Sequence, residues 1–353
     1  MSSKKPFLKI PVNEGERIRK VLLEHDYLDT GYKIVSQHDD LYFPLRQELS
    51  SDKILEITGP IDYDTGDMEF ESALHGPRTL IEALEEHLDA NILDLVPRAY
   101  DLIGDIAIIE IPEELLEYSN LIGRVFLEVH KNFSTVLAKR GAISGTARTR
   151  NYHYLAGKNK TKTVHLEYGC RIAVDVAKAY FSPRLLEEHH RIAQLVQDGE
   201  FVVDMFCGVG PFPIHIAKKC KAHVVAIDIN PEAINLLRES MKMNSLLGTI
   251  EPTVSDAKTY TSTSRKSIAD RVIMNHPSGA FDFVSDACHI LKPNGVIHYY
   301  DFIGGENPED EIMNKIIKLV EESGRSVLDV SLIRRVRDSA PYEYQMVTDL
   351  IIQ

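Results

Sequence analysis

The chain has 353 residues, of which 44% are hydrophobic and 26% charged, a composition typical of a soluble globular protein of two or three domains. Its formal net charge of −13 argues against a nucleic-acid partner for the chain as a whole. No apolar run approaches the ~18 residues of a membrane span, the first residues contain no apolar signal core, and four cysteines are too few for a disulfide scaffold. We therefore expect a reduced, cytoplasmic protein with no membrane association.

The charge is distributed unevenly along the chain. Residues 131–165 contain no acid and eight basic side chains: Lys131, Lys139, Arg140, Arg148, Arg150, Lys158, Lys160 and Lys162. A basic stretch of this kind binds phosphates, while an acidic remainder suppresses unspecific binding. A solvated positive face is the alternative, and the charge pattern alone leaves both interpretations open.

The first 70 residues are expected to form a small mixed unit, 1–70. The spacing of apolar residues predicts a helix over 14–25, and a strand is predicted over 32–37, followed by a His-Asp-Asp turn and the segment LYFPL at 41–45. The polar, glycine-containing stretch 59–72 has the composition of a linker.

Two further domains are expected after this linker. A middle α+β domain over 71–172 contains predicted helices at 78–88 and 112–126 and an apolar strand at 105–111. From 173 to 353, helices and strands alternate with short glycine-bearing turns, which predicts a parallel sheet covered by helices. The predicted fold class is therefore α/β, with a C-terminal Rossmann-like domain preceded by two smaller α+β domains.

The strongest chemical signal is the sequence EFVVDMFCGVGPFPIHIAKK, an apolar strand, a glycine-rich turn and a helix that begin at Glu200. Gly208 and Gly210 allow the backbone to approach a ligand at the start of a helix, where N–H groups are free. The next strand ends at Asp228, where an acid commonly binds the ribose hydroxyls of a nucleoside cofactor. Asp256 ends a third strand and is suited to an exocyclic amine such as that of adenine.

NAD and S-adenosylmethionine are both compatible with these features. The dinucleotide pattern requires a third glycine three residues after Gly210, where this chain has Pro213. The succession VVDMFCGVGPF, VVAIDINP, SDA and DRVIMNHP resembles the class I S-adenosylmethionine-dependent methyltransferases. In this order Asn275 and Pro277 follow the fourth strand, and an asparagine there is suited to the edge of a planar amino-heterocycle. A plain strand-to-helix turn is the alternative for these two residues.

A more specific resemblance lies in the segment before the glycine-rich turn. The strings RTR, LAG and YFSPR, a glutamate four residues after the arginine of YFSPR, and the Asn-x-Pro turn are similar to the archaeal and eukaryotic type of tRNA (guanine-37, N1)-methyltransferase. The resemblance covers most of the chain and leans to the archaeal members. It implies transfer of a methyl group from S-adenosylmethionine to N1 of guanosine 37, with residues 1–70 reaching the tRNA elbow. No exposed apolar stripe stands out, so we expect a monomer.

The resemblance implies roles for individual residues. Glu188 matches a general base for the N1 proton, Arg148 a group that stabilises charge on guanine O6, and Asn275 a residue that hydrogen-bonds the base edge. Guanine N1 is a poor nucleophile until its proton leaves, so a carboxylate and a guanidinium suit this chemistry. The cofactor-binding residues implied are Tyr180, Phe206, Gly208, Gly210, Asp228, Asn230, Asp256, Asn275 and Pro277. The tRNA contacts implied are Arg148, Arg150, Arg184, Lys158 and Lys160.

Some of these assignments have simpler alternatives. Glu188 adjoins Glu187, and only the spacing from Arg184 distinguishes the two acids. Arg148 and Arg150 are both also suited to plain phosphate contacts.

We expect no metal site. His189 and His190 form the most obvious histidine pair, but adjacent residues point to different faces of a helix. His276, inside the Asn-x-Pro turn, departs from the proline or apolar residue of the family pattern.

Three other functions fit parts of the pattern. Enzymes of the wyosine pathway transfer an aminocarboxypropyl group to the same tRNA position on a similar architecture, but the Asn-x-Pro turn and the Arg/Glu pair favour methyl transfer. A non-catalytic RNA-binding protein on this fold would have lost the glycines and acids that are retained here. Methylation of a free small molecule leaves the basic stretch 131–165 without a role.

Overall fold

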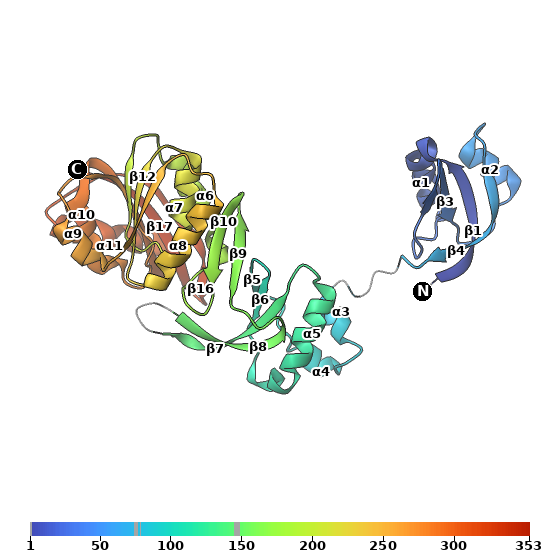
Figure 1. Ribbon diagram of the computed structural model, residues 1–353, viewed down its shortest axis with the longest axis horizontal. Coiled ribbons are helices and arrows are strands. Elements are labelled where there is room, and N and C mark those ends of the chain that lie inside the picture. Colours follow the sequence, from blue (N-terminus) through green and yellow to red (C-terminus); the bar gives the residue numbers. More distant parts are fainter. Residues whose placement is uncertain (1, 74–76, 78, 145–148) are drawn as a thin grey trace. The chain divides into compact units, whose positions relative to one another are not determined.

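The computed structural model describes residues 2–73, 77, 79–144 and 149–353. This part of the chain forms two compact units, Met1–Glu86 and His87–Gln353 (Figure 1). Within the described residues, no helix has the length and apolar character needed to cross a membrane.

The N-terminal unit is built on a four-stranded sheet of the described residues, in the order β2-β3-β1-β4. Its core contains Leu8, Ile18, Leu22 and Phe43, and the apolar spacing that predicted a helix over 14–25 belongs to α1. The elements are β1 (Ser2–Pro11), α1 (Gly15–Glu24), β2 (Val35–Gln37), β3 (Asp40–Pro44), α2 (Ser51–Thr58), β4 (Asp64–Glu71) and α3 (Leu80–Leu84).

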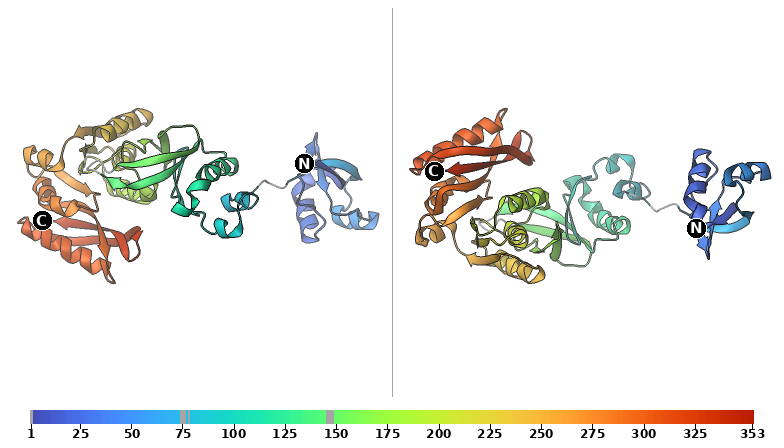
Figure 2. Two further views of the ribbon diagram at one scale, coloured as in Figure 1. Left: turned by 90° about the horizontal axis from the view of Figure 1, so that it is seen from below. Right: turned by 90° about the horizontal axis from the view of Figure 1, so that it is seen from above.

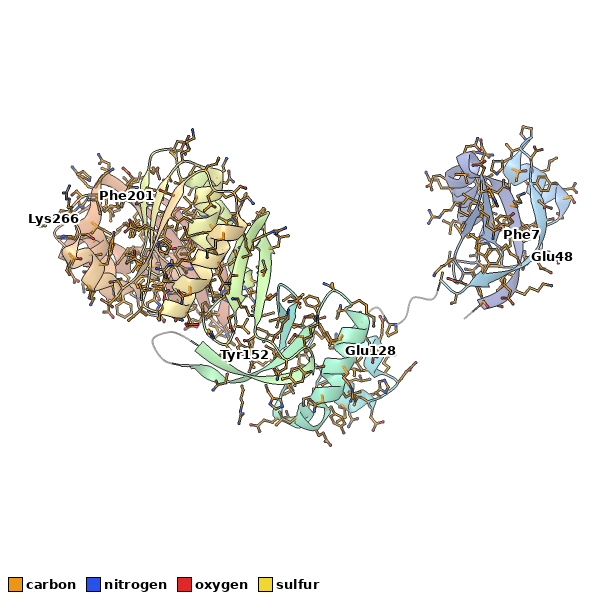
Figure 3. All side chains as sticks on the ribbon, in the orientation of Figure 1. Phe7, Glu48, Glu128, Tyr152, Phe201 and Lys266 are labelled. Atoms are coloured by element: carbon orange, nitrogen blue, oxygen red, sulfur yellow. The ribbon has the colours of Figure 1, made fainter. Side chains whose placement is uncertain are left out.

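The prediction of a linker over 59–72 was wrong, because most of this stretch is strand β4. It pairs antiparallel with β1, with Phe7 opposite Gly66 and Ser2 opposite Glu71 (Phe7 is labelled in Figure 3). Among the described residues of β4, only the side chain of Phe70 is fully buried, and most of the others face solvent. An edge strand with so few buried positions lacks the apolar alternation by which strands are identified from sequence.

The described residues in the first part of the second unit form a four-stranded sheet, in the order β5-β6-β7-β8, and a two-stranded hairpin of β9 and β10. The predicted strand over 105–111 is β6, and the predicted helix over 112–126 is a 3-10 helix at Glu113–Tyr118 followed by α5. The elements are α4 (Ala90–Leu93), β5 (Tyr100–Ile103), β6 (Ile106–Ile109), α5 (Ser119–Val129), β7 (Thr135–Ser144), β8 (Thr149–Gly157), β9 (Lys162–Glu167) and β10 (Cys170–Asp175).

The rest of the second unit is built on a larger sheet. In the described part of the chain it has seven strands, in the order β13-β12-β11-β14-β15-β17-β16. The first five strands in this order run parallel, and β17 pairs antiparallel with both β15 and β16. The strands are β11 (Phe201–Asp204), β12 (His223–Asp228), β13 (Thr249–Val254), β14 (Ala269–Met274), β15 (Leu291–Gly304), β16 (Val327–Ala340) and β17 (Glu343–Ile352). The helices are α6 (Leu186–Leu195), α7 (Pro211–Lys219), α8 (Pro231–Met243), α9 (Ala257–Thr263), α10 (Val284–Ile290) and α11 (Pro308–Glu322).

Helices cover both faces of this sheet because its central strands are apolar on both faces. Val202 and Val224 pack with α6, α7 and α8, whereas their neighbours Val203 and Val225 pack with α9, α10 and α11. Successive side chains of a strand point to opposite faces, so a continuous apolar run serves two cores. Figures 1 and 2 show the sheet between the two groups of helices. This arrangement confirms the predicted α/β class.

A further core joins the smaller sheet to the larger one within the second unit. It contains Ile106 and Leu137 of the four-stranded sheet, Ile172 of β10, and Leu236 of α8. The strands that carry the basic stretch are therefore packed on the Rossmann-like part of the same unit.

Gly210 allows α7 to begin close to α8. Its φ of +81° lies in the left-handed region, and a Cβ atom built on it would lie 2.3 Å from Leu237 Cδ1. Gly208 also has a positive φ, but its nearest neighbour for a Cβ atom is the Tyr180 carbonyl oxygen at 3.7 Å.

We expect Gly210→Ala to lower the free energy of unfolding by about 1–3 kcal/mol, because it combines backbone strain with a clash against Leu237. Urea denaturation measures this change. Gly324→Ala is the matched control, since its φ is +80° and no heavy atom lies within 4 Å of the added Cβ. Equal losses for the two variants would remove the close approach of α7 and α8 as the reason for the glycine.

Candidate active site

A cavity of about 810 Å³ lies at the carboxyl-terminal edge of the parallel strands. Its walls include residues 205–209 after β11, 228–230 at the end of β12, 255–257 after β13 and 275–278 after β14. The carboxyl ends of parallel strands meet at one edge of a sheet, which brings these segments together from distant parts of the sequence.

Asp228 organises the floor of this cavity. Its carboxylate accepts hydrogen bonds from the backbone N–H groups of Gly208 and Asn230, each at 2.8 Å. Burial raises the pKa of Asp228, and these two hydrogen bonds oppose that effect. Asn230 caps α8 by accepting from the N–H of Glu232 at 3.0 Å, and its amide nitrogen donates to the Lys178 carbonyl oxygen at 2.8 Å. The acid therefore faces the cavity at a fixed position and keeps lone pairs for a ligand.

Asp256 and Asn275 lie on the walls of the same cavity. Asp256 caps α9 by accepting the N–H of Thr259 at 3.1 Å. Asn275 Oδ1 accepts from Gln345 Nε2 at 3.3 Å, and Arg337 Nε donates to Gln345 Oε1 at 2.7 Å. The amide of Asn275 is therefore oriented by side chains from the last two strands.

Asp204, at the end of β11, has fewer hydrogen bonds than Asp228. One carboxyl oxygen accepts from the N–H of Phe206 at 3.2 Å, and the other is buried without a hydrogen-bond partner among the described residues. Burial raises the pKa of Asp204 to about 8; the hydrogen bond from Phe206 opposes this shift and the nearby Asp228 adds to it. Asp204 therefore holds its proton more tightly than an ordinary aspartate does.

The cavity brings together most of the cofactor-binding residues predicted from the sequence. Among the described residues that line it are Tyr180, Phe206, Gly208, Asp228, Asn230, Asp256, Asn275 and Pro277. Gly210 lies outside this lining and contacts α8 instead. His276 also lines the cavity, and its ring lies 5.0 Å from the ring of Phe206.

Glu188 is buried beside this cavity and is absent from its described lining. Its side chain is only 1% exposed. It accepts hydrogen bonds from Arg191 Nη2 at 2.9 Å and from the Tyr300 hydroxyl at 2.6 Å, and it forms an ion pair with Arg334. Two guanidinium groups therefore contact this one carboxylate. Glu187, in contrast, is exposed and accepts from the Tyr168 hydroxyl at 2.6 Å.

The ion pair of Glu188 continues into a buried chain of charges. Arg191 Nη1 lies 2.5 Å from Asp349 Oδ2, and Asp349 Oδ1 lies 2.6 Å from His298 Nδ1. Arg271 Nη1 lies 2.8 Å from His298 Nε2. Since arginine only donates, Nε2 accepts and Nδ1 carries the proton, which gives a neutral imidazole. Burial lowers the pKa of His298, in agreement with this neutral form.

The predicted tRNA contacts lie outside the cavity lining, as far as the structure describes them. Arg148 belongs to the residues that the structure does not describe. Lys160 forms an ion pair with Asp105 at 2.6 Å, and Arg184 forms one with Asp101 at 2.8 Å, so both cations already have acidic partners. Lys158 is exposed, and Arg150 is half-buried.

Several residues of the site were missed from the sequence. His189, Arg337 and Gln345 line the cavity, and Arg334 and Tyr300 contact Glu188. Three of these lie on β16 and β17, more than a hundred residues after the glycine-rich turn. The run IRRVR, with three cations in five residues, was the one available signal.

Comparison with known proteins identifies the family. The model of the TRM5/TYW2 methyltransferase domain matches residues 163–333, that of the TYW2 N-terminal domain matches 80–161, and that of the tRNA methyltransferase 5 N-terminal domain matches 8–53. The tRNA (guanine(37)-N(1))-methyltransferase Trm5b of Pyrococcus abyssi is 38% identical over 342 residues, which are 97% of each chain. The chain belongs to this family of enzymes.

Solved structures of the tRNA (guanine(37)-N(1))-methyltransferase family have the same fold. The crystal structure of the P. abyssi Trm5b protein covers 99% of both chains with a TM-score of 0.75. The structure of a complex of aTrm5 with tRNALeu has 35% identity, covers 98% of this chain and 99% of that chain, and has a TM-score of 0.78. The family membership predicted from the sequence is confirmed, and the family is S-adenosylmethionine-dependent.

The chain is also similar to an aminocarboxypropyltransferase. The tRNA(Phe) (4-demethylwyosine(37)-C(7)) aminocarboxypropyltransferase of Pyrococcus horikoshii is 31% identical over 76% of this chain and 94% of its own. The similarity to Trm5b is higher and extends over nearly the whole chain.

Proposed function

We propose that the chain transfers the methyl group of S-adenosylmethionine to N1 of guanosine 37 in the anticodon loop of tRNA. The observation that carries this proposal is the 38% identity to a tRNA (guanine(37)-N(1))-methyltransferase over 97% of both chains. The cavity at the strand ends supports it, because its two acids occupy the positions that a nucleoside cofactor requires.

The described residues of the cavity fit S-adenosylmethionine. Asp228 is held in place by two backbone N–H groups and accepts hydrogen bonds from the ribose hydroxyls. Asp256 accepts a hydrogen bond from the adenine amine. Tyr180 and Phe206 supply aromatic surface, and the turn at Gly208 permits close approach of the ligand. When bound, S-adenosylmethionine supplies an electrophilic methyl group, so this chain has to position and deprotonate the acceptor.

Asn275 positions the guanine base. Because its Oδ1 atom accepts from Gln345, its amide nitrogen remains to donate to guanine O6. Arg148, matched by the family pattern, stabilises the negative charge that grows on O6 as the N1 proton leaves. An anticodon-loop base is unstacked at lower cost than a base within a duplex.

Glu188 is the proposed acceptor of the N1 proton. Its support is the family pattern and its position next to His189, a residue of the cavity wall. A carboxylate paired with two guanidinium groups is a weak base, so proton transfer requires that one of the ion pairs opens. Arg334 is the partner that can leave, because its side chain is 38% exposed and belongs to a different element, whereas Arg191 lies one turn away on α6.

The basic segment contacts the tRNA backbone in this proposal. Lys158 and Arg150 bind phosphates directly, while Lys160 and Arg184 exchange their acidic partners for phosphates. Residues 1–70 form the domain that reaches the tRNA elbow, residues 71–172 carry the basic segment, and residues 173–353 catalyse methyl transfer. The enzyme acts as a monomer in the cytoplasm.

A transfer assay tests the proposed function. Unmodified tRNA transcripts with guanosine or adenosine at position 37 are incubated with the enzyme and S-adenosylmethionine labelled in the methyl group. We expect label on the guanosine transcript alone, and nuclease mapping to N1 of that base. Label that enters a wyosine-precursor tRNA from the aminocarboxypropyl part of the cofactor would establish the alternative reaction. No transfer of either group would contradict an enzymatic role on tRNA.

Glu188→Gln is expected to slow methyl transfer by ~10²-fold or more, because the amide cannot accept the N1 proton. Single-turnover kinetics with saturating tRNA and cofactor measure the chemical step. Glu187→Gln is the matched control: the neighbouring acid is exposed, and we expect its rate to stay within about twofold of wild type. Circular dichroism and cofactor titration establish that both variants are folded and bind S-adenosylmethionine. Equal rates for the Glu188 variant and wild type would exclude this carboxylate as the base.

A further inference from the structure

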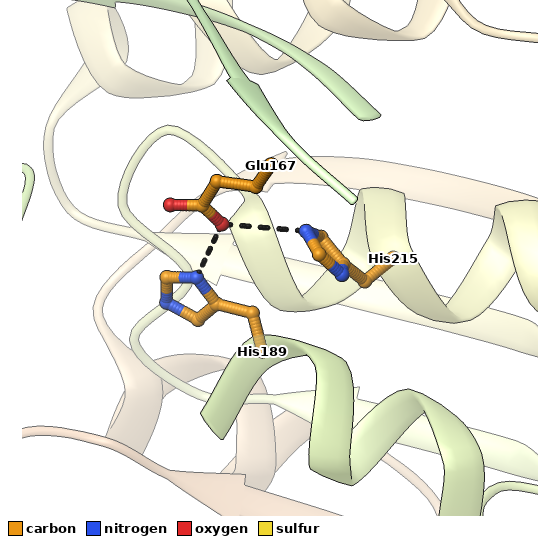
Figure 4. A group of neighbouring side chains, drawn as sticks. All are labelled: Glu167, His189 and His215. Atoms are coloured by element: carbon orange, nitrogen blue, oxygen red, sulfur yellow. Dashed lines mark hydrogen bonds and ion pairs between the residues drawn. The ribbon is translucent and has the colours of Figure 1, made fainter. Parts of the chain in front are cut away.

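Three side chains with metal-binding atoms meet beside the cavity (Figure 4). Glu167 ends β9, His189 lies on α6 and His215 lies on α7. Each side chain is at most 2% exposed. The cluster is thus enclosed by three elements of the same compact unit.

The geometry of the cluster is that of a convergent ligand set. Glu167 Oε2 lies 2.8 Å from His189 Nδ1 and 3.3 Å from His215 Nε2, and one ligand atom from each residue lies within 4.8 Å of the others. In a tetrahedral zinc site with bonds of ~2.0–2.1 Å, neighbouring ligand atoms are about 3.3 Å apart. Only small side-chain shifts therefore separate the observed arrangement from such a site.

Two polar atoms of the cluster are buried without a hydrogen bond. They are Glu167 Oε1, which lies 3.5 Å from His165 Nε2, and His215 Nε2, which lies 3.3 Å from Glu167 Oε2; neither atom has a hydrogen bond among the described residues. Burying a polar atom without a partner is unfavourable, so both atoms point to a missing ligand. A cation bound between the carboxylate and the imidazoles would satisfy them together.

Cys170 offers a fourth ligand to this cluster. It lies directly opposite Glu167 in the β9–β10 hairpin, whose connecting residues Tyr168 and Gly169 both have positive φ, as in a type I′ turn. The cysteine is a buried free thiol and interacts with His215. The hairpin thus carries Glu167 of the three-residue group and places Cys170 next to it in the sheet.

We propose that Glu167, His189, His215 and Cys170 bind one zinc ion. Nitrogen, sulfur and a single carboxylate form a zinc-type ligand set, whereas magnesium and calcium prefer oxygen ligands alone. Four protein ligands leave no open position, so the ion is structural. It fixes α6 and α7 to the hairpin, and His189 transmits this constraint to the cavity wall that it lines.

Metal analysis of the full chain tests the site. The protein is expressed with zinc in the medium, purified without chelators and analysed by mass spectrometry for metals. We expect about one zinc ion per chain in wild type, and a loss of at least about fivefold in His215→Gln and Glu167→Gln. His223→Gln is the matched control, since His223 also lies beside a glutamate, 3.5 Å from Glu251, but at the surface. Zinc retention in this control supports the proposal.

Cobalt substitution provides a test that needs no variant to fold. Wild type refolded with Co²⁺ is expected to show the visible absorption of a tetrahedral site and a thiolate charge-transfer band, and Cys170→Ser is expected to lose the charge-transfer band. The proposal is overturned if folded wild type binds neither metal, or if the His215 and His223 variants retain equal zinc. Absence of the charge-transfer band in wild type overturns the assignment of Cys170.

Discussion

The parallel direction of β11, β12 and β14 is the constraint on which the site depends. It delivers Asp204, Asp228 and Asn275 to one edge of the sheet, although they are separated by up to about seventy residues in the sequence. Helices can cover both faces because alternate side chains of these strands are apolar on each face. At these strand ends, polar groups from several segments surround a large cavity.

The buried charges around Glu188 connect the cavity to the end of the chain. Removing one member of a buried ion pair leaves its partner uncompensated, so Glu188, Arg191 and Asp349 stabilise the fold only as a group. This group ties α6 to β17, and Arg334 adds a contact from β16. The same ion pairs reduce the basicity of Glu188, so the proposed catalysis requires tRNA binding to change the environment of a residue that the fold holds tightly.

Local patterns predicted the fold and the glycine-rich turn after β11, but not the contacts between distant segments. Short-range periodicity and turn chemistry were enough to predict strand β11 and the positions of Gly208 and Asp228 at strand ends. Both residues line the cavity. Gly210 stays predicted as a cofactor-binding residue, and the structure adds a second reason for the glycine that the sequence did not reveal, the close approach of Leu237 from another helix. Glu167 and His215 lie 48 residues apart in the numbering and meet only through the fold, so adjacent histidines gave no signal of their cluster.

In the proposed function, the cavity binds S-adenosylmethionine through Asp228. Isothermal titration of wild type, Asp228→Asn and Asp329→Asn with S-adenosylmethionine tests it most directly, since Asp329 is an exposed acid of the same unit. We expect Asp228→Asn to bind at least about tenfold more weakly, because it loses a charged hydrogen-bond acceptor, and Asp329→Asn to bind as wild type does. Equal affinities for all three proteins would contradict the account.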